Sequence, residues 1–85
     1  IELNTESTVI IYPNPTSSEF IVKTYQTSFS EKDRIQIFSI LGEQLYSSSI
    51  NSQQTTVNLS NFSQGTYILI TSINGTQKTF KILKE

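Results

Sequence analysis

The side chains that could do chemistry are few in this chain of 85 residues. It contains no histidine and no cysteine. The nucleophile and base pairs of hydrolases and the thiolate zinc sites therefore cannot be assembled from their usual groups. What remains is one pair of neighbouring carboxylates, four tyrosines and a series of spaced lysines. The sequence predicts that the protein is not an enzyme, with no catalytic residue and no cofactor.

Glu31 and Asp33 are the closely spaced carboxylates, and such a pair can act in acid–base catalysis or bind calcium. Lys32 and Arg34 alternate with them along the chain. Alternating charges of this kind are typical of a solvated loop. We therefore interpret the segment as a solvated mixed-charge loop and assign no metal to it.

The tyrosines could form a platform that stacks on sugars. They are Tyr12, Tyr25, Tyr46 and Tyr67. Tryptophan, the usual stacking residue, is absent. We favour the interpretation that Tyr12 and Tyr67 pack at the core or at an edge while their hydroxyl groups reach a hydrogen-bond partner. A carbohydrate-binding role stays open as the alternative.

Lys78, Lys81 and Lys84 are spaced through the end of the sequence, with Phe80 and Ile82 between them. Lysines on an edge strand prevent pairing with other chains. The same side chains could also be what a receptor recognises, and the two interpretations are compatible. Because the formal net charge is −1, the chain lacks an extended basic surface, and we expect no nucleic-acid partner.

The elements that carry these side chains are predicted to be strands, because short stretches of β-branched and aromatic residues alternate with polar ones. The expected strands cover residues 9–12, 19–25, 34–40, 44–49, 55–59, 66–73 and 77–83. Residues 9–12 end at Pro13-Asn14-Pro15, which predicts an edge strand entering a fixed turn. Residues 66–73 form the longest apolar run, and we expect a central strand that is covered on both faces.

Alternation within these strands also predicts the core, and glycines mark the turns. Phe20, Val22, Phe80 and Ile82 are assigned inward, Ile35 shares a face with Ile37, and Val57 shares a face with Leu59. Each of the three glycines, Gly42, Gly65 and Gly75, stands between two expected strands. We interpret them as turn or loop residues, because glycine reaches positive φ without a Cβ clash. Asn74-Gly75 predicts a two-residue hairpin turn of the primed type.

Together these patterns predict an all-β fold, a small antiparallel immunoglobulin-like β-sandwich of about seven short strands over residues 9–85. Residues 1–8 are interpreted as a linker or loosely held N-terminal segment. No apolar run reaches the roughly 20 residues that cross a bilayer, so we expect no direct membrane insertion. Methionine is absent even at position 1, and we expect the chain to be a piece of a larger precursor.

Three motifs and the lysine-rich end occur in an order that resembles a known family. The motifs are Tyr12-Pro13-Asn14-Pro15, residues 35–43 (IQIFSILGE) and residues 58–67 (NLSNFSQGTY). Over residues 10–85 their order and spacing resemble the type A C-terminal sorting domain of the type IX secretion system. The resemblance implies that the recognition residues are Tyr12, Pro13, Asn14, Pro15, Gly42, Gly65, Tyr67, Lys78, Lys81 and Lys84.

The resemblance further implies a C-terminal secretion signal on a larger cargo protein of a Bacteroidetes-type bacterium. The implied partners are the N-terminal cargo domain of the same precursor, the translocon and shuttle proteins of the type IX system, and a surface sortase. The precursor is expected to fold in the periplasm and to cross the outer membrane. The sortase is then expected to cut in or before residues 1–8, so that the cargo is secreted or held at the cell surface.

Two other functions fit the same residues. A carbohydrate-binding or adhesive immunoglobulin-like accessory module would bind polysaccharides and would lose that binding when exposed tyrosines are changed to alanine. A structural spacer between domains would tolerate a further domain after Glu85, whereas a C-terminal sorting signal would not.

Overall fold

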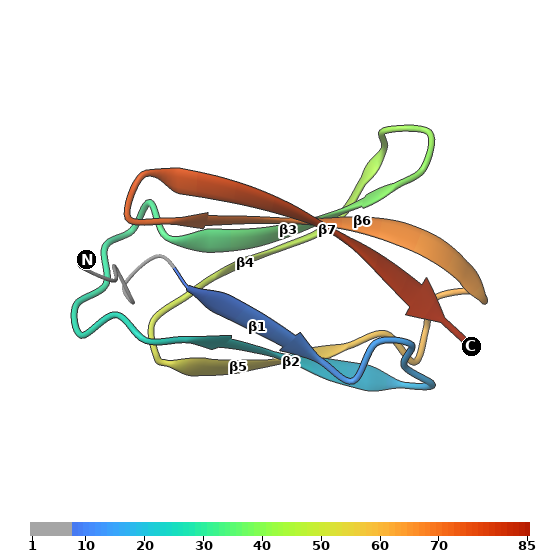
Figure 1. Ribbon diagram of the computed structural model, residues 1–85. Coiled ribbons are helices and arrows are strands. Elements are labelled where there is room, and N and C mark those ends of the chain that lie inside the picture. Colours follow the sequence, from blue (N-terminus) through green and yellow to red (C-terminus); the bar gives the residue numbers. More distant parts are fainter. Residues whose placement is uncertain (1–7) are drawn as a thin grey trace, which may run out of the picture.

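The computed structural model describes residues 8–85, which form two antiparallel β-sheets packed face to face. One sheet has the strand order β1-β2-β5 and the other the order β4-β3-β6-β7 (Figure 1). The strands are β1 (Val9–Tyr12), β2 (Glu19–Thr24), β3 (Arg34–Ser39), β4 (Gln44–Ser49), β5 (Gln54–Asn58), β6 (Gly65–Ile73) and β7 (Thr76–Lys84). The predicted all-β sandwich is confirmed, and β1 is an edge strand as expected.

The core lies between the two sheets, because every second residue of each strand points inward. The buried apolar side chains are Phe20, Val22, Ile35, Ile37, Ile50, Val57, Leu59, Leu69, Ile73 and Ile82. In the larger sheet Ile37 pairs with Leu69 and Leu69 with Phe80, which places the three side chains in one row across the strands. Burial of each aliphatic side chain contributes about 1.5–3 kcal/mol. The predicted inward positions are confirmed, with Phe80 only partly buried against this core.

Strand β6 is central, as predicted, but its outer face is not covered. Ile68 and Ile70 point away from the core and are half-buried, and neither belongs to the buried set. Their partners across the sheet include Phe38 on one side and Lys81 on the other. The expectation of cover on both faces is therefore wrong for residues 8–85, because the sandwich has two layers and no third layer lies on this sheet (Figure 1).

The hairpin between β6 and β7 has the predicted turn. Asn74 has φ of 56° and Gly75 has φ of 78°, and two successive residues with positive φ define a type I′ turn. This turn twists in the same sense as the strands, so β6 and β7 pair without a break from Gly65 with Lys84 to Ile73 with Thr76.

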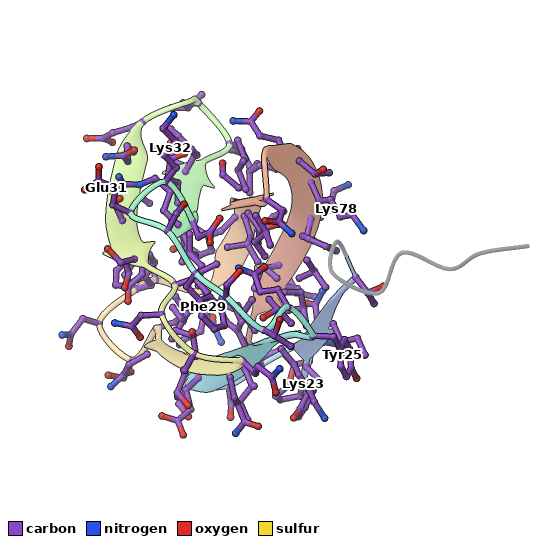
Figure 2. All side chains as sticks on the ribbon, turned by 90° about the vertical axis from the view of Figure 1, so that its left-hand side faces the viewer. Lys23, Tyr25, Phe29, Glu31, Lys32 and Lys78 are labelled. Carbon is purple, nitrogen blue, oxygen red and sulfur yellow. The ribbon has the colours of Figure 1, made fainter. Side chains whose placement is uncertain are left out.

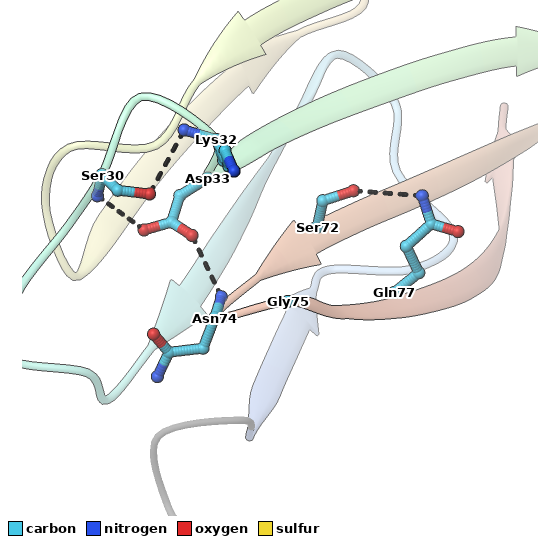
Figure 3. Close-up of a pocket in the computed structure, with 7 residues that line it drawn as sticks. All are labelled: Ser30, Lys32, Asp33, Ser72, Asn74, Gly75 and Gln77. Atoms are coloured by element: carbon cyan, nitrogen blue, oxygen red, sulfur yellow. Dashed lines mark hydrogen bonds between the residues drawn. The ribbon is translucent and has the colours of Figure 1, made fainter.

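Asp33 fastens the loop between β2 and β3 to the β6–β7 turn (Figure 3). Its Oδ1 accepts the Asn74 amide at 3.0 Å, and its Oδ2 accepts the Ser30 amide and the Gln26 Nε2, each at 2.9 Å. With 3% of its surface exposed, Asp33 is not part of a solvated loop, and that interpretation is wrong for this residue. It holds for Glu31 and Lys32, which are exposed (Figure 2). A charge pattern along the chain gives the neighbours of a carboxylate but not the direction in which it points.

Burial alone would raise the pKa of Asp33. The hydrogen bonds from Asn74, Ser30 and Gln26 outweigh that effect and hold the pKa of this carboxyl below its usual value. The charged form is therefore the one that the fold stabilises.

Residues 1–7 of the predicted linker lie outside the described residues, so the boundary at residue 8 stays a prediction. Within residues 8–85, no helix is long and apolar enough to cross a membrane.

Candidate recognition site on the last strand

The Tyr12-Pro13-Asn14-Pro15 turn lies against strand β7. Both Tyr12-Pro13 and Asn14-Pro15 are cis peptide bonds. The Asn14 side chain spans two residues of β7, since its Nδ2 donates to the Lys81 carbonyl at 2.8 Å and its Oδ1 accepts the Leu83 amide at 3.0 Å. Asparagine suits this position because its amide group carries both a donor and an acceptor.

Thr16 continues the contact along β7 through its backbone. Its amide donates to the Leu83 carbonyl at 2.9 Å, and its carbonyl accepts the Glu85 amide at 2.8 Å. Thr16 and Lys84 thereby form a parallel bridge, and Thr16 is 2% exposed. We call the four hydrogen bonds of Asn14 and Thr16 to residues 81–85 the clamp. The clamp joins the chain between β1 and β2, in one sheet, to the edge of the other sheet.

The clamp closes one half of the β7 edge. Of the backbone groups that face outward, the Lys81 carbonyl, both polar groups of Leu83 and the Glu85 amide are bonded to Asn14 and Thr16. By the alternation of an antiparallel pair, those of Gln77 and Thr79 also face outward. No backbone hydrogen bond within residues 8–85 reaches that outer side of Gln77 or Thr79. Among residues 8–85, the half of β7 that follows the Asn74-Gly75 turn is therefore an open edge.

The three lysines of β7 lie in different environments. Lys81 is exposed on the outer face of the sheet, and Lys78 is half-buried. Lys84 is 8% exposed, and its Nζ contacts the Glu85 carbonyl at 3.4 Å. The cause is alternation, because Lys78 and Lys84 share the inward face with Ile82 while Lys81 points the other way. The structure does not bring the three charges together on one surface. Lys78 on the inward side of an edge strand fits the protective role expected of lysines there.

The segment from Asn58 to Tyr67 forms a compact connection from β5 to β6. The Ser60 amide donates to the Asn58 side chain at 2.8 Å, and the Leu59 side chain is fully buried. The Tyr67 hydroxyl donates to the Ser63 carbonyl at 2.6 Å, an arrangement known as a tyrosine corner. Gly65, which opens β6, has φ of 149°, a conformation that favours glycine.

The sequence also matches a known protein family. The sequence model of one family, described as the secretion system C-terminal sorting domain, matches residues 10–85. That match covers almost the whole chain and includes both the Asn14 turn and strand β7. The chain belongs to this family. It is a C-terminal sorting signal of type IX secretion, and the family is one of sorting signals and not of enzymes. No curated protein shows a significant match.

The tyrosines of the sorting domain do not form one surface. Tyr12 pairs with Ile21 at one end of the β1–β2 ladder, whereas Tyr25 follows the other end. The Lys23 ammonium lies 5.4 Å from the centre of the Tyr25 ring. The predicted hydroxyl partner is confirmed for Tyr67. Tyr12 is 40% exposed instead, and no partner of its hydroxyl lies within residues 8–85.

Gly42 of the sorting domain lies in the β3–β4 turn with φ of 94°, far along the chain from the clamp. Thr16, which sequence reasoning missed, supplies two of the four clamp bonds. The signal for it was weak, since a threonine after Pro15 does not indicate which strand it meets. Within residues 8–85, no three potential metal-ligand side chains cluster together.

Proposed function

We propose that this sorting domain is an address on a larger cargo protein, read by the type IX machinery as a folded surface around the clamped end of β7. The observation that carries the proposal is the clamp itself, in which Asn14 and Thr16 hold residues 81–85. The clamp joins the first turn of the domain to its last strand. The surface at this end therefore exists only when the whole domain has folded.

The recognition residues implied by the resemblance divide into two roles in this proposal. Asn14, Gly65 and the Tyr67 hydroxyl shape and hold the surface, because their interactions are internal. The exposed recognition residues near the clamp are Tyr12, Pro13, Pro15 and Lys81. Leu83, which the resemblance does not imply, is exposed beside them on β7. Lys81 supplies the positive charge that a receptor meets, and Lys84 contributes through the fold.

The route of the cargo follows from the same proposal. The cargo domain precedes this domain in the precursor, and the precursor folds in the periplasm. Translocon and shuttle proteins bind the clamped end, and a surface sortase cuts in or before residues 1–8 after export. In the folded domain β1 begins at the end of the sandwich opposite to the end of β7 (Figure 1). A cargo attached before β1 would thus leave the clamped end accessible.

A reporter experiment tests the proposal. A fluorescent protein with an export signal is fused before residues 1–85 and produced in cells that have or lack the type IX apparatus. We expect surface delivery only in cells with the apparatus, and retention in the periplasm when residues 78–85 are deleted. Delivery without the apparatus, or normal delivery of the deletion variant, would refute the proposal.

A further inference from the structure

The β3–β4 hairpin carries the most exposed large apolar side chains of residues 8–85. Leu41 is 93% exposed and Ile40 is 70% exposed. The hairpin extends beyond the body of the sandwich, on the side where β7 ends (Figure 1). Large aliphatic side chains displayed this openly are costly in water, and contiguous ones mark interaction sites. We call residues 39–43 the finger.

The finger is held in one shape by hydrogen bonds that converge on Ser39. The Ser39 amide donates to the Glu43 carbonyl at 2.8 Å, and the Ser39 carbonyl accepts the Gly42 amide at 3.0 Å. The Ser39 Oγ accepts the amides of Leu41 and Glu43, each at 3.2 Å. A turn fixed in this way loses little conformational entropy when it binds. The hydrogen bonds of the turn thus keep the Ile40 and Leu41 side chains exposed.

An apolar notch of ≈ 300 Å³ lies beside the finger. Its lining residues are Leu45, Asn61, Phe62, Ser63 and Tyr67. Leu45 reaches the notch because β3 and β4 shift register there: Ile37 pairs with Tyr46 but Phe38 pairs with Gln44, which leaves Leu45 as the extra residue of a bulge. The rings of Phe62 and Tyr67 meet edge to face, with centroids 5.3 Å apart. The notch has the size to accept one or two apolar side chains.

The charges of the finger and the notch favour a protein partner over a lipid surface. The five residues that line the notch are uncharged, and Glu43 is the charged residue of the finger. An anionic lipid surface attracts basic residues and would be repelled by Glu43. An uncharged apolar surface with a fixed shape is instead typical of the centre of a protein interface.

We propose that finger and notch form a docking surface for one protein component of the secretion machinery. That component presents an apolar socket to Ile40 and Leu41, an apolar side chain to the notch, and a basic residue to Glu43. The inference rests on the proposed function and adds a second contact surface, separate from the clamp, at the same end of the domain.

The test compares two variants in the reporter fusion. Ile40→Ser with Leu41→Ser removes the apolar finger, and Ile10→Ser is the matched control, because Ile10 is 40% exposed on the other sheet. Melting of the purified domains verifies that both variants fold. A photoreactive phenylalanine analogue placed at position 41 or at position 10 then identifies the neighbour during export.

We expect the finger variant to lower surface delivery by about tenfold, the effect of losing about 1.4 kcal/mol of binding free energy. The Ile10→Ser control should export normally, and Leu41→Ile alone should retain export. Position 41 should cross-link to a protein of the apparatus and position 10 should not. Normal export of a folded finger variant, or cross-linking of position 41 to lipid or polysaccharide alone, would overturn the inference. Failure of the wild-type fusion to export would refute the proposed function instead.

Discussion

The Leu83 amide donates to Asn14 Oδ1 at 3.0 Å across 69 positions of the chain. This bond, with the Asn14 Nδ2 bond to Lys81, makes a turn at the start of the domain part of the edge of its last strand. A receptor that reads this edge therefore reads a feature that neither segment forms alone.

Replacement of Asn14 by alanine should loosen the end of β7. The change removes two hydrogen bonds, and each contributes about 0.5–1.5 kcal/mol. We expect the free energy of unfolding to fall by about 1–2 kcal/mol and the Leu83 amide to exchange its hydrogen faster. Denaturant unfolding and hydrogen exchange measure the two effects, with the exposed Asn51→Ala as the control. Unchanged exchange at Leu83 would show that the bond does not hold the strand.

The strands and most of the core were predictable from the sequence because those signals are local. Alternation assigned Phe20 and Val22 inward, and Asn74-Gly75 specified its turn, without knowledge of the partner strands. The same alternation, applied to β7 with Phe80 and Ile82 inward, also places Lys84 inward, although a role in recognition suggested exposure. The clamp was not predictable, since it depends on how the two sheets sit against each other. Nothing in the spacing of Asn14 and Leu83 encodes that placement.

The stability of the domain should depend on the charge of Asp33. Its pKa is lowered in the folded state, so its hydrogen bonds stabilise the fold fully above the unfolded pKa of about 3.9. That contribution is lost as the pH falls from there through the folded pKa. We expect the melting temperature to drop between pH 5 and pH 2 by less in Asp33→Asn than in the wild type. The exposed Glu31→Gln variant should keep the wild-type drop. An equal drop in Asp33→Asn would contradict this role.

The domain should become more stable when Thr71 is replaced by valine. Thr71 is 0% exposed on the inward face of β6, and its hydroxyl has no hydrogen-bond partner within residues 8–85. Valine has nearly the same shape and removes a buried polar group, whose burial costs about 1–3 kcal/mol. We expect a gain of about 1 kcal/mol, seen as a rise of about 4 °C in the melting temperature. Thr56→Val, on an exposed position of β5, should have little effect. A lower melting temperature for Thr71→Val would mean that the hydroxyl is satisfied.

Alanine at position 65 should destabilise the domain through the backbone alone. A Cβ on Gly65 would meet no atom within 4 Å, yet φ is 149°. Holding an L-residue in this region costs about 1–3 kcal/mol. Chemical synthesis with D-alanine at the same position gives the control, because a D-residue adopts positive φ without that cost. If L-alanine and D-alanine gave the same free energy of unfolding, strain at this position would not be the cause.

The central claim is that the machinery reads a folded surface in which the clamped β7 is embedded, and not a linear tail. Surface delivery of one reporter should be measured with the whole chain and with residues 76–85 alone, in cells that carry the type IX apparatus. We predict delivery by the whole chain and periplasmic retention with the isolated segment. Equal delivery by residues 76–85 would contradict the account.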